Sequence, residues 1–280
     1  MHSREQRAGG GGRRIGAQRR VAGSAAGLIL LLCSHAVAQT LTGAADAVEP
    51  VSNWYLELDA AYRPPGQAWV ERLSKHLYDE TAAFNVRYRP SEDASFGVGA
   101  GRRLWRSLAV GVGLTYFRTM SGTRVSGSVP HPLFTGRPRT FEHAPDDTRF
   151  REVGVHLHAG WTFRITDRID LRLVGGPSLF DVRRDRLTGI DTSETGPRYE
   201  EVTSAGDMRA VAQRRIPGVN AGIDLTYYFA RNLEPGSFFW KAGIGGFARW
   251  VGGTAELPEP ESEPLSVRSW QGGLSLRIRF

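Results

Sequence analysis

The sequence predicts an all-β fold: a closed up-and-down antiparallel transmembrane β-barrel of eight strands, with long extracellular loops. Three observations predict it. Apolar and polar residues alternate with a period of two in segment after segment, so each segment can form a ribbon with one apolar face. The connections between these segments are alternately long and short, as in transmembrane barrels. No apolar run reaches the ~20 residues that a membrane-spanning helix needs, so a chain crossing a membrane would have to close a barrel.

The N-terminal segment is typical of a secretory signal peptide. Residues 1–20 contain six arginines and one glutamate, a short apolar run follows over residues 21–33, and Ala36-Val37-Ala38 ends the segment. A basic region, a short apolar core and an A-x-A site are the three parts of such a signal. We therefore expect residues 1–38 to be cleaved before Gln39 and to export the chain through the inner membrane.

Removal of this segment changes the composition of the chain. The full sequence has 36 basic and 29 acidic residues, and the loss of six arginines and one glutamate leaves 30 against 28. A nearly neutral chain gives no support for nucleic-acid binding. The one cysteine, Cys33, lies within the segment, so we expect a mature chain without disulfides. The remainder is expected to form a short lead-in over residues 39–50 and one barrel domain over residues 51–280.

The first half of this domain contains four alternating segments. In the first, Trp54, Leu56 and Leu58 share one face, and the prolines after residue 63 end it because proline cannot donate to a ladder. The second is interrupted at Pro90 and is predicted to be one long, bulged strand. In the third, large apolar residues alternate with glycines, as a narrow barrel requires on its inner face. These four strands are predicted over residues 51–63, 83–101, 108–117 and 152–164.

The second half repeats the pattern four more times. A bulge is expected near Gly175-Gly176-Pro177, within the fifth segment. The last segment ends on Phe280, with apolar residues at every second position counted back from it. These four strands are predicted over residues 169–180, 219–229, 238–250 and 265–280.

The connections fix the orientation that the barrel would have in a membrane. Short turns are predicted near residues 103–106, 166–168 and 231–236, and long extracellular loops over residues 64–82, 119–148, 184–214 and 252–265. Residues 67–82, within the first long loop, also fit a short helix. An even number of antiparallel strands with this asymmetry places both ends of the domain on the periplasmic side. Tryptophan and tyrosine gather toward the strand ends, where aromatic girdles lie.

Several of these segments together resemble the small eight-stranded outer-membrane β-barrel proteins of Gram-negative bacteria, of the OmpX and OmpA-barrel type. The resemblance is carried by Phe96–Gly101, Val110–Tyr116, Glu152–Trp161, Gly175–Phe180 and Gly273–Phe280. It implies an outer-membrane location, a monomer, and outer-membrane lipid and lipopolysaccharide as partners. The terminal pattern resembles the signal by which the barrel-assembly machinery recognises its clients, carried here by Leu274, Leu276, Ile278 and Phe280.

Ionisable residues at the inward positions of the alternating segments predict a polar network that fills the lumen. Isolated buried charges are costly, so a narrow barrel must pair them or leave a wet channel. The candidate network comprises Glu152, His156, His158, Arg172, Asp224, Lys241, Arg249, Arg277 and Arg279.

Metal and cofactor sites are weaker interpretations of the same residues. Glu152, His156 and His158 share a face, and a His-x-His pair on a strand can bind zinc. Glu152 and His158 are about 20 Å apart along one strand, so that strand cannot supply all three ligands. Residues 97–101 contain alternating glycines but lack the spacing and the following helix of a dinucleotide loop. We therefore predict no metal, no cofactor and no catalytic residue.

The predicted function is that of a non-enzymatic integral outer-membrane protein with a structural, surface-interaction or small, porin-like role. One alternative is an outer-membrane lipid-modifying hydrolase, for which Ser178 and His131 are possible members of a site. Another is a soluble, exported, lipocalin-like barrel, which would need Leu276, Ile278 and Phe280 to point inward. The loop that holds His131, Arg137 and Arg139 is interpreted as solvated, and contact of its two arginines with lipopolysaccharide phosphates is the alternative.

Overall fold

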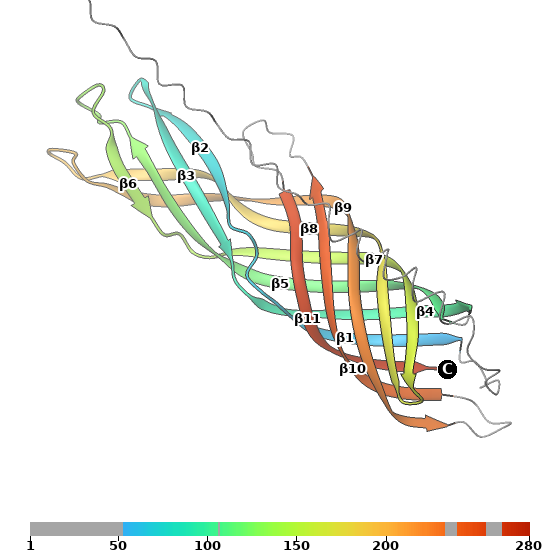
Figure 1. The fold of residues 1–280 in the computed structure, drawn as a ribbon. Helices are drawn as coiled ribbons and strands as arrows, with labels where there is room; N and C mark the ends of the chain where they lie inside the picture. The colour runs from blue at the N-terminus through green and yellow to red at the C-terminus, as the bar shows by residue number, and fades with distance from the viewer. Residues whose placement is uncertain (1–52, 106, 233–239, 256–264) are drawn as a thin grey trace, which may run out of the picture. The chain divides into compact units, whose positions relative to one another are not determined.

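Eight strands form a closed ring of hydrogen bonds in a computed structural model that describes residues 53–105, 107–232, 240–255 and 265–280 (Figure 1). Going round the ring, each neighbouring pair is antiparallel, and β5 pairs with β7 to close it. In ring order the strands are β5 (Leu108–Val129), β4 (Asp93–Trp105), β1 (Trp54–Arg63), β11 (Leu265–Arg279), β10 (Trp240–Ala255), β9 (Val202–Asn232), β8 (Ile169–Glu194) and β7 (Thr148–Thr166). The predicted signal peptide and lead-in lie outside the described residues. Among the described residues, no helix is long and apolar enough to cross a membrane.

The predicted alternation separates an apolar outer face from a polar inner face. Leu56 and Leu58 on β1 are exposed on the outer face, and Glu57 between them is buried in the lumen. Leu276 and Ile278 on β11 are 41% and 39% exposed, and Arg277 between them is fully buried. Because these apolar side chains point outward and the charged ones inward, the lipocalin-like interpretation is wrong.

Small residues on the inner face of β5 make room for side chains from the opposite walls. Gly111 faces Gly101 in the ladder, and a Cβ on Gly111 would collide with the Tyr55 hydroxyl. The predicted mixture of large outward and small inward residues on this strand therefore has a direct steric cause.

The first long connection is a β-hairpin, so the prediction of a loop or short helix over residues 67–82 is wrong. β2 (Trp69–Leu77) pairs with β3 (Glu80–Pro90), and the chain turns at Tyr78 and Asp79. Both turn residues have positive φ, 52° and 60°, as in the two-residue hairpin turns whose twist matches that of the strands. The predicted long, bulged strand over residues 83–101 is two strands, β3 and β4, which pair with successive parts of β5.

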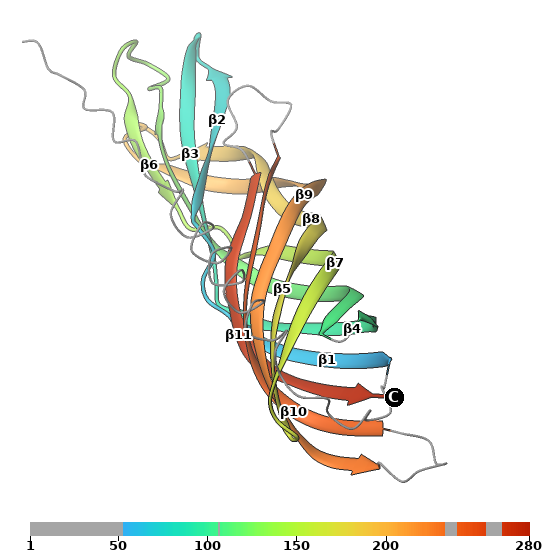
Figure 2. The same ribbon diagram turned by 45° about the vertical axis from the view of Figure 1, so that its right-hand side comes forward.

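The second and third long connections are also mostly strand. β5 continues to Val129 and pairs there with β6 (Arg139–His143), while β8 and β9 extend as a hairpin joined by residues 195–201. Figures 1 and 2 show β2, β3, β6 and the far ends of β5, β8 and β9 continuing beyond β10 and β11. We call this region the extension. It has its own hydrophobic core, formed by Ala82, Phe84, Val86, Tyr88, Val125, Val129, Phe141, Leu187 and Ile190.

The remaining predicted connections are only partly described. The short turn at residues 166–168 is present between β7 and β8. Near the predicted turn at residues 103–106, β4 ends at Trp105 and β5 begins at Leu108. Residues 233–239 and 256–264, which include most of the predicted turn at 231–236 and loop at 252–265, lie outside the described residues.

Candidate functional site

The centre of the barrel lumen is an ion-pair network built on Glu57. Arg172 Nη2 on β8 donates to Glu57 Oε2 at 2.6 Å, and Arg277 Nη2 on β11 donates to the same oxygen at 3.0 Å. Both guanidinium groups also reach Asp224 Oδ2 on β9, at 2.6 and 3.1 Å. Two carboxylates and two arginines from four strands thus neutralise one another inside the wall.

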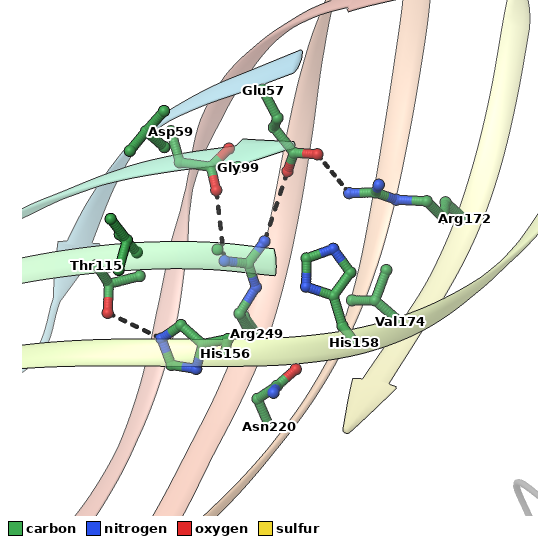
Figure 3. A pocket seen from close by; sticks show the side chains of 13 residues that line it. Glu57, Asp59, Gly99, Thr115, His156, His158, Arg172, Val174, Asn220 and Arg249 are labelled. Atoms are coloured by element: carbon green, nitrogen blue, oxygen red, sulfur yellow. Dashed lines mark hydrogen bonds and ion pairs between the residues drawn. The ribbon is translucent and has the colours of Figure 1, made fainter. Parts of the chain in front are cut away.

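Arg249 on β10 extends this network along β1. It lies 3.6 Å from Glu57 Oε1 and donates to Asp59 Oδ2 at 3.4 Å, so it bridges two inward residues of one strand (Figure 3). Arg277 Nη1 donates to the Thr226 hydroxyl at 2.6 Å. Such close charge-assisted bonds offset the desolvation of the buried groups.

Separate ion pairs lie on either side of the central network. Arg63 donates through both terminal nitrogens to Glu152, at 2.8 and 2.9 Å, and its guanidinium stacks 4.3 Å from the Phe117 ring. Arg279 donates to Asp170 Oδ2 at 2.5 Å. Together with the centre, these contacts join five buried or half-buried arginines to five carboxylates.

The two lumen histidines bind neutral partners. His156 Nδ1 lies 2.8 Å from Ser178 Oγ and its Nε2 lies 2.9 Å from Thr115 Oγ1, while Asn220 donates to Ser178 at 2.9 Å. His158 Nε2 lies 3.0 Å from the Tyr55 hydroxyl. These contacts order the imidazole rings within the lumen wall.

Little free volume remains between these side chains. The cavity bounded by Glu57, Asp59, His156, His158, Arg172 and Arg249 has about 20 Å³ of space for the centre of a water molecule (Figure 3). A volume of that order holds about one water. At this level the described side chains fill the lumen.

The structure brings most of the candidate network residues into these contacts. Lys241 differs, since it is half-buried and lies beside Arg279 in the ladder at the end of β10 remote from the extension. The sequence interpretation missed five ionisable partners. They are Glu57, Asp59, Arg63, Asp170 and Tyr55. Each occupies an inward position in the alternation of its strand, and this alternation could have identified it from the sequence.

The weaker candidate sites do not assemble. Ser178 contacts His156 in the lumen, while His131 receives a bond from Leu133 N and lies 3.2 Å from Arg198 O. These contacts do not join the two possible members of the hydrolase site. Glu152 is held by Arg63, apart from the two histidines. No cluster of three or more His, Cys, Asp or Glu residues within the described ranges could hold a metal ion.

The loop arginines proposed to contact lipopolysaccharide have protein partners. Arg139 donates to Glu194 Oε1 at 2.5 Å, and Arg137 lies over the Phe134 ring at 5.5 Å. Arg139 therefore links β6 to β8 through its ion pair with Glu194.

Comparison with known proteins shows a similarity of fold only. No sequence-family model matches, and no curated protein matches in sequence. Among solved structures, Neisserial surface protein A is 14% identical, with 81% of this chain and 97% of that chain covered and a TM-score of 0.37. Ail, the attachment invasion locus protein of Yersinia pestis, is 15% identical, with 80% and 99% covered and a TM-score of 0.31. The outer-membrane protease OmpT from Escherichia coli is 10% identical, with 81% and 97% covered and a TM-score of 0.45.

The hydrogen-bonded ring, the apolar outer face and the charged lumen make this chain, by its fold, a small eight-stranded β-barrel of the outer-membrane type.

Proposed function

We propose that the protein is an integral outer-membrane barrel whose extension binds a partner at the cell surface, and that it is neither a pore nor an enzyme. The observation that carries the proposal is the extension itself. A spanning strand needs about 9–11 residues, whereas β8 has 26 residues and β9 has 31. The excess length of these strands forms the packed extension, beyond the part of the wall that carries the exposed apolar side chains.

The apolar belt supports the membrane placement. Exposed apolar side chains occupy successive outward positions on neighbouring strands, and they include Leu58, Val98, Val112, Leu114, Leu157, Ile223, Leu225, Ile244, Leu274 and Leu276. Soluble monomers rarely expose a contiguous apolar surface of this extent. A lipid environment removes that cost.

The extension is an ordered surface. Phe84 and Phe141 pack edge to face with ring centroids 5.4 Å apart. Burial and the neighbouring Glu71 carboxylate raise the pKa of the Tyr88 phenol above its ordinary value, so this hydroxyl stays protonated. It accepts a hydrogen bond from Leu187 N at 2.8 Å and thereby joins β3 to β8. An ordered surface loses little conformational entropy on binding, which favours recognition of a partner.

Exposed apolar residues mark the tip of the extension. Leu133 and Phe134, between β5 and β6, are 63% and 50% exposed. Large apolar side chains that face water at the end of a rigid support are typical anchors for a binding partner. The filled lumen argues against a pore as the main activity.

Two measurements test the proposal. Cells displaying the wild type should attach to at least one surface in a panel of fibronectin, laminin, collagen, heparin and cultured epithelial monolayers. Leu133→Ser/Phe134→Ser should lose that attachment, whereas Val211→Ser, which changes an exposed apolar residue on the outer face of β9, should keep it. Purified wild type in a planar bilayer should show no discrete conductance. Attachment no greater than that of cells with empty vector, or stepwise wild-type currents, would overturn the proposal.

A further inference from the structure

Three arginines stand in one line across the outer face of the barrel wall. In the ladders, Arg118 on β5 is the direct partner of Arg151 on β7, and Arg151 is the direct partner of Arg183 on β8. All three occupy outward positions, since the inward neighbours Phe117, Glu152 and Val182 are buried. We call these three residues the arginine row. Adjacent strands are about 4.8 Å apart, so the row spans ~10 Å.

The arginine row lies immediately above the apolar belt. One outward position closer to the belt, Tyr116 on β5 is paired with Val153 on β7, and the next outward position on each strand carries Leu114 and Val155. On the other side the row faces the extension, because β5 continues from there into its pairing with β3. The row therefore lies at the level where lipid headgroups would surround a barrel in a membrane.

The charges of the row have no acidic partner within the described residues. No carboxylate oxygen there lies within the 4.0 Å of an ion pair from any of the three guanidinium groups. Asp181, also on the outer face of β8, is instead bound through both oxygens by the Gln213 amide at 2.9 Å. Like charges directly opposite each other destabilise a sheet, so an external anion would relieve a real cost.

Arg151, in the middle of the row, has a donor that no protein acceptor satisfies. Its Nε is buried yet has no hydrogen-bond partner, and its side chain as a whole is half-buried. A buried donor without an acceptor lowers stability, so the protein alone does not satisfy this guanidinium group. Further arginines extend the positive surface toward the extension, since Arg149 is exposed next to the row and Arg124 is paired with Arg87 between β5 and β3.

We propose that the arginine row binds the phosphate groups of a phosphorylated lipid of the leaflet that surrounds this end of the barrel. Guanidinium groups bind phosphate through two parallel hydrogen bonds, and three of them in a line match one or two phosphates on a headgroup. The acyl chains of the same lipid lie against the apolar residues directly below the row. The inference rests on the membrane placement proposed above, and it adds a defined lipid site to that placement.

A lipid titration in micelles tests this site separately from cell attachment. Refolded wild type in a zwitterionic detergent is titrated with bisphosphorylated lipid A, and bound lipid is counted by native mass spectrometry. The same titration uses lipid A from which both phosphates have been removed, and inorganic phosphate alone. Wild type is expected to bind the bisphosphorylated lipid at least tenfold more tightly than the dephosphorylated one, with weaker binding at higher salt, and inorganic phosphate should compete only at far higher concentration.

The variants remove equal charge from the row and from elsewhere. Arg118→Gln/Arg151→Gln/Arg183→Gln should lose at least tenfold in affinity for the bisphosphorylated lipid. The matched control is Arg72→Gln/Arg168→Gln/Arg231→Gln, which removes three exposed arginines from β2, the turn after β7 and the end of β9 and should bind like wild type. Folding of each variant is checked by its heat-dependent migration on a gel.

Equal binding of the two lipid A forms by wild type would overturn the proposal. This comparison uses wild type alone, so it does not depend on the folding of any variant. Equal affinity of wild type and the row variant, or an equal loss in the control, would overturn it as well. Cell attachment has no part in this measurement, so failure of the surface-binding proposal leaves the lipid result interpretable, and the reverse also holds.

Discussion

Arg277 on β11 contacts Glu57 on β1, and the two residues are direct partners in the ladder between these two strands, the seam where the first and last strands of the ring meet. The two residues are 220 positions apart in the sequence, and the ring of strands brings them together. The seam of the barrel is therefore held by an ion pair as well as by backbone hydrogen bonds.

Replacement of Glu57 should destabilise the barrel strongly. Glu57→Gln removes the carboxylate charge that Arg172 and Arg277 share and leaves both cations buried. Loss of one partner of a buried ion pair costs about 3–5 kcal/mol. Urea unfolding from lipid vesicles should show a lower midpoint for this variant. Glu92→Gln is the control, because it changes an exposed carboxylate in the connection between β3 and β4, and the glutamine oxygen can still accept the bond from the Tyr62 hydroxyl. This variant should match wild type. An unchanged midpoint for Glu57→Gln would contradict the role assigned to the network.

Gly111 should tolerate no side chain. Gly111→Ala places a methyl group against the Tyr55 hydroxyl and 2.7 Å from His158 Nε2, and overpacking of this kind costs roughly 1–3 kcal/mol. Gly113→Ala, two residues further on the same face, is a matched control because its nearest neighbours are 3.8 Å away. The two unfolding midpoints should differ clearly, and Tyr55→Phe should partly rescue Gly111→Ala. Equal midpoints for the two alanine variants would show that the lumen packing is looser than described.

The extension should lose its packing independently of the barrel. Phe84→Ala removes an aromatic ring from the extension core, at a cost of about 3–5 kcal/mol. Trypsin added outside intact cells should then cut the extension faster than in wild type, while the barrel keeps its heat-dependent migration on a gel. Asn85→Ala, on the exposed face of β3, should leave the cleavage rate unchanged. If Phe84→Ala abolished barrel folding as well, the two regions would form one cooperative unit.

Phe280 should matter for assembly more than for stability. Phe280 exchanges backbone hydrogen bonds with Trp54, at 2.9 and 3.0 Å, and those bonds do not depend on its side chain. Phe280→Ser should therefore lower the amount of folded protein in the outer membrane of cells. The free energy of unfolding of the refolded variant should stay within about 0.5 kcal/mol of wild type. An unchanged amount in cells would argue against the terminal assembly signal.

The parts of the fold that follow from strand parity could be predicted from the sequence. Leu276 and Arg277 illustrate this, because neighbouring residues of a strand must face opposite sides whatever the strand pairs with. The extension could not be predicted in this way. Val125 and Val129 lie in a stretch rich in serine and glycine, and their burial depends on Leu187 and Ile190, which lie on a hairpin far along the chain.

The alternation within single strands also could not predict which side chains contact one another in the lumen. Arg172 contacts Glu57 across 115 residues because the strands of a closed barrel are staggered as well as tilted. The alternation of one strand identifies which side chains enter the lumen, and the stagger of all eight strands decides which of them meet.

The continuity of β5 has a mechanical consequence. Residues 108–117 of this strand pair with β4 within the barrel, and residues 121–128 pair with β3 within the extension, without a break between them. A bound partner that pulls on the extension therefore loads the ladders of β5 along the strand axis. Many hydrogen bonds then resist the force together, whereas a flexible loop would pass it to them one at a time. A load on the extension would therefore reach the barrel as shear along β5.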